Sequence, residues 1–578
     1  METKTQPQTK EANPMKKQRM TGSEAVMQSL LHEGVDLLFG YPGGAIMPIY
    51  DALYHYQDKL NHVLVRHEQG AVHAAQGFAR VTGKVGVCMV TSGPGATNAV
   101  TGIADAMVDS TPMVVISGQV ASPLLGTDAF QETDVVGITQ PITKWNYQVK
   151  RAEEIPEAIA KAFYIARSGR PGPVLIDITK DAQFAQIDYE YKPVEKVRSY
   201  TPATPTKKDK VAEAARLINL AKKPLALVGQ GVVLGNAEKE LKTFLEKSGI
   251  PAAWTLLGLS ALPTEHELNV GMLGMHGNYG PNVKTNESDL IIAIGMRFDD
   301  RVTGNVQKYA TNAKVVHLEI DPAEINKIIY ADVPVVGNVK ESLPMLTAMV
   351  SENEHTDWLN EFRVCDKVEN QKIINEELFP SKKGMTMGEV IRRVTDSYGD
   401  DAIMVTDVGQ HQMMASRYFK FKNTRSVVTS GGLGTMGFGL PAALGAQMGQ
   451  PERPVCLFVG DGGFQMTIQE LGTIFQTNAP VKIILLNNNF LGMVRQWQEM
   501  FFDKRYASTE LVNPDFQMIA KGYGVAGAIV DDRDNLDAAV QQMVSHDGPF
   551  LLEVKVEKEG NVFPMVPTGA SVSEIRLE

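Results

Sequence analysis

The run PVCLFVGDGGF, residues 454–464, decides the fold of this 578-residue chain when it is read together with VKIILLNNN, residues 481–489. Each is a short apolar run that ends in small or polar residues, a pattern typical of a strand buried on both faces of a parallel sheet. The carboxyl ends of neighbouring parallel strands open on the same edge of a sheet, where α/β folds bind ligands. The two runs therefore predict a ligand site at the ends of both strands.

The residues at these strand ends are suited to a metal and a diphosphate. Asp461 can give a carboxylate oxygen, and Asn488 an amide oxygen, to one hard cation such as Mg²⁺, which proteins commonly hold with one or two groups beside substrate phosphates. Gly460 and Gly462 let the backbone come close to a diphosphate. Taken singly, GDG is more often a tight turn and NNN a loop. Their pairing on two strand ends favours the metal–diphosphate interpretation.

The same pattern recurs along the rest of the chain: short apolar runs bounded by Gly or Pro alternate with segments that have helical periodicity. This predicts an α/β fold of three doubly wound parallel-sheet domains. The remaining runs that we interpret as strands are 35–44, 63–67, 84–98, 111–118, 172–179, 223–231, 288–298, 314–321, 401–409 and 425–430.

Changes in composition divide the chain. Residues 191–208 are rich in Pro, Thr and Lys, and residues 351–383 are polar, so both are interpreted as linkers. Residues 1–19 are polar without an apolar core, which predicts a disordered tail rather than a signal peptide. The three domains are then expected at 20–190, 209–350 and 384–578.

Bulk properties exclude several classes of protein. A net charge of −11 argues against nucleic-acid binding, which needs a basic face. No run of eighteen apolar residues occurs, so we expect no membrane span and a cytoplasmic protein. The three cysteines, Cys88, Cys365 and Cys456, form no CxxC pair; they indicate a reducing compartment and are interpreted as small buried apolar residues.

The motifs resemble those of one enzyme family. GDG followed at this distance by NN resembles the thiamine-diphosphate motif, and from about residue 20 onward the chain resembles the acetolactate synthase family. The segments that carry the resemblance are RHEQGAVHAAQGFAR, TSGPGATN, GTDAFQET, RPGPVLIDITKD, RFDDRVTG, DVGQHQM, LGTMGFGLPAA and LGMVRQWQ. The resemblance implies a thiamine-diphosphate-binding fold in the first (pyrimidine-binding) and last (diphosphate- and Mg²⁺-binding) domains, and a Rossmann-like, FAD-associated central domain.

The resemblance also assigns roles around thiamine diphosphate. The residue matching Glu68 hydrogen-bonds the aminopyrimidine and promotes loss of the C2 proton, chemistry that benefits from a dry site. Met436 would wedge beneath the cofactor, and Asp461, Asn488 and the backbone carbonyl of Phe490 would hold Mg²⁺. Some family members carry His where this chain has Phe490. Further expected cofactor contacts are Val408, Gly409, Gln410, His411, Gly434, Gly462, Gly463, Leu491, Gly492 and Met493.

Other matched residues concern the substrate and a flavin. Arg301 is expected to bind the carboxylate of a second ketoacid, since a guanidinium suits bidentate binding; the alternative is an ion pair with Asp299 or Asp300. Gln131 and Lys180 are expected at the catalytic site, and Phe130, Met275 and Trp497 along the substrate channel. FAD without a redox role is expected at Arg170, His276, Gly295, Arg297, Asp299, Glu319 and Asp321.

The resemblance implies a transferase of branched-chain amino-acid biosynthesis. It would decarboxylate pyruvate and join the two-carbon unit to a second pyruvate or 2-ketobutyrate, giving 2-acetolactate or 2-aceto-2-hydroxybutyrate. It would work as a homodimer or tetramer with active sites between subunits, together with a small regulatory subunit. The alternatives are pyruvate oxidase or another thiamine-dependent decarboxylase, a non-catalytic binding protein, and an NAD dehydrogenase. Only the GxGxxG match at residues 432–437 supports the last, and the acidic residue expected about twenty positions later is absent.

Overall fold

The computed structural model describes residues 18–578, so the tail expected at residues 1–19 lies almost wholly outside the described part. The expectation is wrong for its last two residues. Gln18 and Arg19 belong to strand β1 (Gln18–Thr21), whose backbone pairs antiparallel with β8 (Gln186–Tyr189). The threonine that ends β1 caps the first helix of the chain through its side chain.

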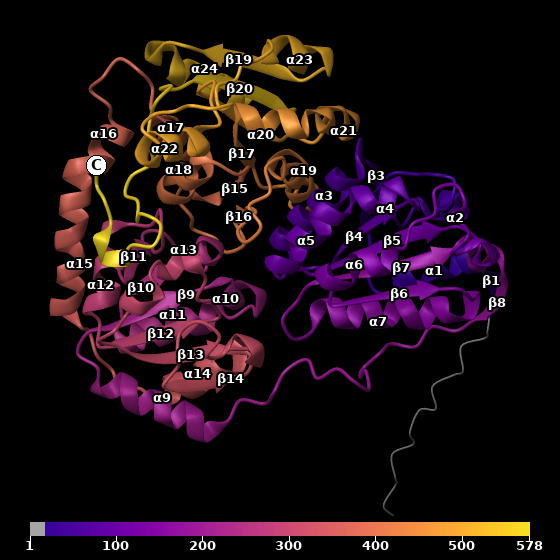
Figure 1. The fold of residues 1–578 in the computed structure, drawn as a ribbon, viewed down its shortest axis with the longest axis horizontal. Coiled ribbons are helices and arrows are strands. Elements are labelled where there is room, and N and C mark those ends of the chain that lie inside the picture. Colours follow the sequence, from indigo (N-terminus) through magenta and orange to yellow (C-terminus); the bar gives the residue numbers. More distant parts are fainter. Residues whose placement is uncertain (1–17) are drawn as a thin grey trace, which may run out of the picture.

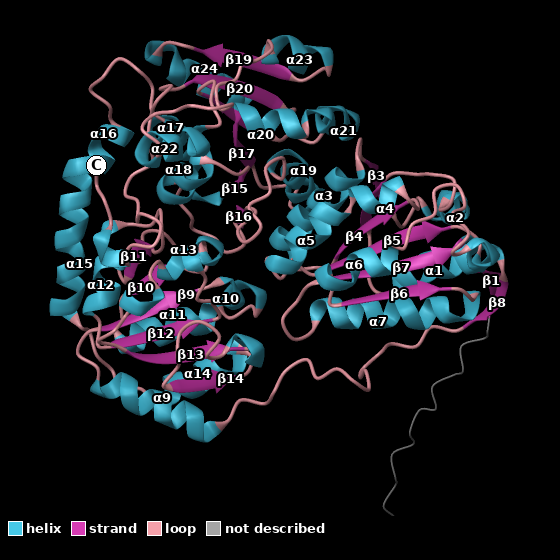
Figure 2. Ribbon diagram, viewed as in Figure 1, coloured by secondary structure: helices cyan, strands magenta, loops and turns pink. Residues whose placement is uncertain are grey.

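The first domain is a parallel sheet with helices on both faces (Figures 1 and 2). Across the sheet its strands run β3 (Asn61–Leu64), β2 (Leu37–Gly40), β4 (Gly86–Val90), β5 (Met113–Gln119), β7 (Pro173–Thr179) and β6 (Trp145–Val149). Its helices are α1 (Gly22–His32), α2 (Met47–Leu53), α3 (Glu68–Thr82), α4 (Pro94–Asn98), α5 (Val100–Val108), α6 (Val135–Thr139), α7 (Ile155–Arg167) and α8 (Lys180–Phe184).

The third domain repeats the strand order of the first, although their sequences are not visibly repeated. Numbered along the chain, the strands of both sheets lie in the order 2-1-3-4-6-5. In the third domain these are β16 (Val427–Val428), β15 (Ile403–Thr406), β17 (Val455–Gly460), β18 (Lys482–Asn487), β20 (Phe550–Lys555) and β19 (Ala526–Val530). Its helices are α17 (Met387–Tyr398), α18 (Gln410–Tyr418), α19 (Gly439–Gly449), α20 (Asp461–Met466), α21 (Leu471–Thr477), α22 (Gly492–Phe501), α23 (Phe516–Gly522) and α24 (Leu536–Ser545).

The central domain has the order 3-2-1-4-5-6, which is the Rossmann arrangement. Its strands are β11 (Asn269–Met272), β10 (Ala252–Trp254), β9 (Pro224–Val228), β12 (Leu290–Ile294), β13 (Lys314–Glu319) and β14 (Val333–Val336). Its helices are α9 (Lys208–Leu220), α10 (Gln230–Leu234), α11 (Glu238–Ser248), α12 (Tyr279–Glu287), α13 (Asp300–Thr303) and α14 (Val339–Met349). The segment 351–383 that follows contains α15 (Thr356–Glu369), a π-helical turn (Asn370–Ile374) and α16 (Asn375–Leu378).

The predicted fold class is confirmed, and each apolar run that was interpreted as a strand overlaps one, although β3 begins two residues before the run at 63–67. The sequence interpretation missed β1, β6, β8, β10, β11, β14, β19 and β20. Several of these strands are half-exposed or very short, so they lack the continuous apolar run of a central strand. Cys88, Cys365 and Cys456 are all buried, as expected.

The first and third domains share a continuous apolar core where α3 packs against α19. The two helices approach closely because glycines face the opposite backbone. A methyl group at Gly77 would lie 2.0 Å from the carbonyl oxygen of Ala442, and one at Gly445 would lie 1.8 Å from that of Ala74. In Figure 1 the first domain lies at the right, the third at the upper left and the central domain below it. Across residues 18–578, no helix combines the length and the apolar character needed to cross a bilayer.

Candidate active site

A cavity of about 1060 Å³ lies mainly between the central and third domains, and first-domain residues such as Ser110 and Arg170 line one part of it. In the central and third domains it sits at the carboxyl edge of the sheet, at the point where the strand order reverses, which is where open α/β sheets bind ligands. In the central domain these positions are Gln230, after β9, and Gly295, after β12. In the third domain they are Gly409, after β15, and Gly460, at the end of β17. The carboxyl edges of the central and third sheets, where each would bind a ligand, therefore face the same cavity.

The third-domain wall is shaped for an anionic group. Helices α18, α20 and α22 all begin at the cavity, and the N–H groups of a first helical turn have no partner within the helix. The backbone is exposed there because a side chain would not fit. A methyl group at Gly463 would lie 2.2 Å from Asp407 Oδ1, and one at Gly492 would lie 2.1 Å from Gln410 Oε1. Three helix N-termini and bare backbone fit a diphosphate.

The expected metal ligands lie on this wall. Asp461 and Asn488 line the cavity at the ends of the neighbouring strands β17 and β18. Burial raises the pKa of Asp461 to about 6, although the Asn513 side chain donates a 2.6 Å hydrogen bond to its Oδ2. Asn488 Oδ1 accepts from the backbone N–H of Phe490 at 3.1 Å. A buried carboxylate beside an amide and a backbone carbonyl fits Mg²⁺, and residues 18–578 hold no cluster of three or more His, Cys, Asp or Glu that would suit a softer ion.

His411 points to a ligand as well. It lines the cavity, and its buried Nε2 has no hydrogen-bond partner. Burial lowers the pKa of His411 to about 3, so the ring is neutral at pH 7. A buried imidazole nitrogen without a partner is uncommon in a native structure. The ring can therefore hydrogen-bond a molecule in the cavity.

The glycine-rich loop that carries Met436 is held by three buried carboxylates. Asp407 accepts hydrogen bonds from the backbone of Gly437 at 3.0 Å and of Gly439 at 2.8 Å. Asp105 and Asp109 of the first domain hold the beginning of the loop through its side chains and backbone. The loop lies between a two-residue strand and α19, so the GxGxxG match is not a nucleotide-binding turn. Met436 and Gly434 line the cavity, as expected.

The central-domain wall forms a second site for a phosphate-containing ligand. Helices α10 and α14 begin there, and a methyl group at Gly231 would lie 2.7 Å from the Cα atom of Gly295, so the wall is bare backbone. Burial raises the pKa of Glu319 to about 7. Arg170 pairs with Asp321 at 3.2 Å and with Glu324 at 2.9 Å, at the edge of this wall. Two helix N-termini beside bare backbone fit the phosphates of a dinucleotide such as FAD.

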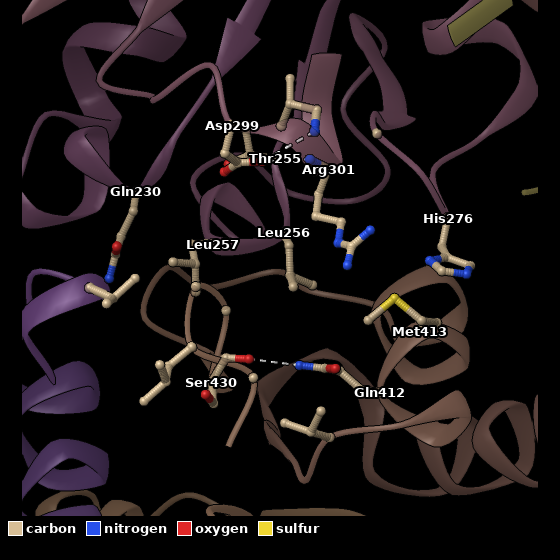
Figure 3. A pocket seen from close by; sticks show the side chains of 18 of the residues that line it. Gln230, Thr255, Leu256, Leu257, His276, Asp299, Arg301, Gln412, Met413 and Ser430 are labelled. Carbon is tan, nitrogen blue, oxygen red and sulfur yellow. Dashed lines mark hydrogen bonds between the residues drawn. The ribbon is translucent and has the colours of Figure 1, made fainter. Parts of the chain in front are cut away.

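Arg301 reaches into the cavity from the central domain, beside His276 (Figure 3). Its side chain is 61% exposed and lies 3.8 Å from Asp300, a contact too long and too exposed to fix the guanidinium. Asp299 instead caps α13 through the backbone N–H groups of Arg301 and Val302. Burial lowers the pKa of His276 to about 4, so the charge at this point comes from Arg301. The arrangement fits recognition of a carboxylate.

Most of the predicted site residues are therefore brought together. Trp497 and Met493 line the cavity from α22, and Met275 lines it from the loop after β11. Asp321 does not line it and reaches it only through Arg170. The cavity also includes positions that carried no motif, among them Thr255, Leu256, Leu257 and Ser430, which Figure 3 labels. The predicted residues that line it are Arg170, Met275, His276, Gly295, Arg297, Asp299, Arg301, Glu319, Val408, Gly409, Gln410, His411, Gly434, Met436, Asp461, Gly462, Gly463, Asn488, Phe490, Leu491, Gly492, Met493 and Trp497.

Four predicted residues stay in the first domain, away from this cavity. Glu68 begins α3, is buried, and accepts a 3.0 Å hydrogen bond from Asn98. Phe130 is 88% exposed. Gln131 adopts a φ of 62°, a strained conformation that often marks a functional loop. Lys180 begins α8 at the carboxyl end of β7. One chain alone does not bring these residues to Asp461.

Comparisons with known proteins agree with this architecture. Residues 20–138, 211–346 and 407–554 match the family models of the N-terminal TPP binding, central and C-terminal TPP binding domains of thiamine pyrophosphate enzymes. The acetolactate synthase large subunit of Corynebacterium glutamicum is 47% identical over 97% of this chain and 90% of its own length. The chain belongs to the acetolactate synthase large-subunit family. The Lactococcus lactis large subunit is 44% identical over 96% of both chains, and that of Escherichia coli isozyme 2 is 45% identical over 96% of this chain and 99% of its own length.

Membership of this family confirms the resemblance seen in the sequence. It identifies an enzyme with two thiamine-diphosphate-binding domains, which the shared strand order of the first and third sheets reflects. It favours the acetolactate synthase interpretation over pyruvate oxidase and over an NAD dehydrogenase. Asn513, which contacts Asp461, and Asp105 and Asp109, which hold the glycine-rich loop, were missed by the sequence interpretation because they belong to no motif.

Proposed function

We propose that the chain decarboxylates pyruvate and joins the two-carbon unit to a second pyruvate or to 2-ketobutyrate, giving 2-acetolactate or 2-aceto-2-hydroxybutyrate. One observation carries the proposal: the metal- and diphosphate-type wall with Asp461 and Asn488 shares a single cavity with the guanidinium of Arg301. Thiamine diphosphate, when bound, supplies a carbon nucleophile and an electron sink for the decarboxylation.

The third domain would hold the cofactor. Asp461, Asn488 and the backbone carbonyl of Phe490 would hold Mg²⁺, and the first turns of α18, α20 and α22 would hold the diphosphate. Met436 would support the ring system from its clamped loop. The neutral imidazole of His411 can donate or accept one hydrogen bond inside this dry space.

The second substrate would be held by charge and by shape. Arg301 binds its carboxylate, since the ion pair with Asp300 is too weak to occupy the guanidinium. Trp497 narrows the acceptor space from α22, where its ring packs at 5.2 Å from that of Phe501. FAD would occupy the central-domain wall from Gln230 to Glu319 and act as a structural part of the site without a redox role.

The remaining residues would come from a second copy of the chain. Glu68 would hold the proton at N1′ of the aminopyrimidine, with Gln131, Lys180 and Phe130 beside the substrate. One feature of the structure supports this arrangement: these residues do not line their own chain's cavity, which Asp461 and Asn488 do line. We therefore propose a homodimer or a dimer of dimers. The relatives are named large subunits, which supports a small regulatory partner.

The test is the product formed from pyruvate with thiamine diphosphate, Mg²⁺ and FAD, compared with the Glu68→Gln variant. Acetolactate, strongly reduced in this variant, is the expected result. Glu157→Gln, which alters an exposed ion pair on α7, is the control and should act as the wild type does. Acetaldehyde, or acetate with reduced flavin, would move the chain to the decarboxylase or oxidase reaction and contradict the proposal.

A mixing experiment tests the shared site. Chains with Glu68→Gln and chains with Asp461→Asn are each expected to be inactive. After they exchange subunits, half of the dimers are hybrids with one intact site, so activity should recover to about a quarter of the wild-type value. No recovery, despite hybrids seen by native mass spectrometry, would place the whole site within one chain.

A further inference from the structure

The loop between β11 and α12 carries part of the cavity wall and also supports Arg301. Met275 and His276 line the cavity from this loop. The backbone N–H of Met275 donates to the carbonyl oxygen of Arg301 at 2.7 Å, and Arg301 Nη1 lies 3.5 Å from Met275 Sδ. A shift of this loop would therefore move both the central-domain wall and the guanidinium of Arg301.

A buried arginine from the third domain holds the loop. Arg417 lies in the last turn of α18, and no part of its side chain is exposed. Its Nη1 donates to the carbonyl oxygen of Gly277 at 2.9 Å and points to that of His276 at 3.4 Å. The first turn of the same helix carries Gln410 and His411 at the diphosphate wall. One nine-residue helix thus contacts both halves of the cavity.

A buried glutamate also takes part in this contact between α18 and the loop. Glu369, the last residue of α15, pairs with Arg417 Nη2. Its carboxylate also accepts from Asn278 Nδ2 at 3.1 Å and from the backbone N–H of Tyr279 at 2.7 Å. Tyr279 is the first residue of α12, so the carboxylate occupies the positive end of that helix. Every hydrogen bond that this ion pair makes with the central domain goes to a residue within 276–279.

We infer that Arg417 and Glu369 are positioning residues. They fix the central-domain wall, which would bind FAD, and Arg301 relative to the third-domain wall, which would bind thiamine diphosphate. The ion pair is enclosed on both sides and links three separate segments, so removing one partner leaves an unpaired buried charge that must draw in water or shift its neighbours. Among the described residues, 18–578, no other side-chain hydrogen bond or ion pair joins the loop at 275–278 to α18. The identity of the two ligands rests on the proposed function.

The test compares Arg417→Met with the wild-type holoenzyme. We expect the Kd for FAD, from flavin fluorescence, and the KM for the acceptor ketoacid to rise about tenfold or more, since small displacements of positioning groups have effects of this size. The Kd for thiamine diphosphate should change much less, because the first turn of α18 is held separately: Gln410 donates to Gln496 at 3.0 Å and to Gly560 at 2.9 Å. The Arg417→Lys variant keeps the positive charge but lacks the two donor arms of the guanidinium. Its Kd for FAD and its KM for the acceptor should therefore lie between those of the wild type and of Arg417→Met.

A matched control is Arg393→Met, which removes a largely buried arginine from its pair with Glu389 on α17, away from the cavity. The control should lower the melting temperature without changing either constant. Equal effects of the two methionine variants on FAD and on the acceptor would overturn the inference, and so would an Arg417→Met variant with wild-type constants. If the wild type forms no acetolactate, the proposed reaction fails, but the comparison of flavin Kd values still decides the role of Arg417. If it binds no FAD, the comparison of KM values decides it.

Discussion

Replacement of Gly445 by Ala tests the close contact between the first and third domains. A methyl group there would lie 1.8 Å from the backbone carbonyl oxygen of Ala74, whereas a normal carbon–oxygen contact is about 3.3 Å. The helices α3 and α19 must therefore separate by about 1.5 Å, because a backbone carbonyl cannot rotate away as a side chain can. Such overpacking costs about 1–3 kcal/mol, and the better helix propensity of Ala returns at most about 1 kcal/mol.

The net effect is destabilisation by up to about 2 kcal/mol, which corresponds to a fall in melting temperature of about 4–8 °C for a unit the size of the third domain. Differential scanning fluorimetry measures it. Catalytic activity should fall as well, because α3 begins at Glu68 and α19 begins just after the loop that carries Met436. The control is Gly522→Ala at the end of α23, where a methyl group would meet nothing within 4 Å.

The control should melt at or slightly above the wild-type temperature. If Gly445→Ala melts like the control and keeps full activity, the helix contact is not tight enough to govern the relation of the two domains, and the reasoning is refuted.

Two further predictions concern the diphosphate wall. Burial raises the pKa of Asp407 to about 6 from 3.8, so its contribution to stability is present in full below pH 4 and is lost as the pH rises through 6. The stability advantage of the wild type over Asp407→Asn should therefore shrink by about 3 kcal/mol between pH 4 and pH 7, and a difference independent of pH in denaturant titrations would contradict this. Gly492→Ala would press a methyl group against Gln410 Oε1, and the amide cannot easily turn away because its Nε2 donates two hydrogen bonds. We expect thiamine diphosphate to bind about tenfold more weakly, by calorimetry, while Gly522→Ala binds normally.

Much of the site can be predicted from short stretches of sequence, because its central strands have a strong local pattern. PVCLFVGDGGF and VKIILLNNN are each apolar enough to be buried on both faces, and parallel strands place their carboxyl ends on one edge. The sequence alone therefore predicts Asp461 and Asn488 as neighbours, and the cavity contains both. The three α/β blocks and the burial of Cys88 and Cys456 follow from the same kind of pattern.

Other features depend on packing between distant segments, which no local pattern encodes. Asp105 and Asp109 bond a loop more than 300 residues away, and on their own they are ordinary acidic residues of a short helix. Glu369 lies within a polar stretch, 351–383, that has the composition of a linker, and it becomes the buried ion-pair partner of Arg417 only when α15 packs on the central domain. Neither segment carries a motif.

The sequence by itself determined the residue types, the strand ends on which they lie and, through its motifs, the family. The tertiary structure decided which edges face each other: two strand-order reversals meet at one cavity, and Glu68 is left outside it. The physical reason is that hydrophobic periodicity is set by neighbours within a few residues, whereas the cavity and its buried charges arise where three independently patterned domains bury surface against one another.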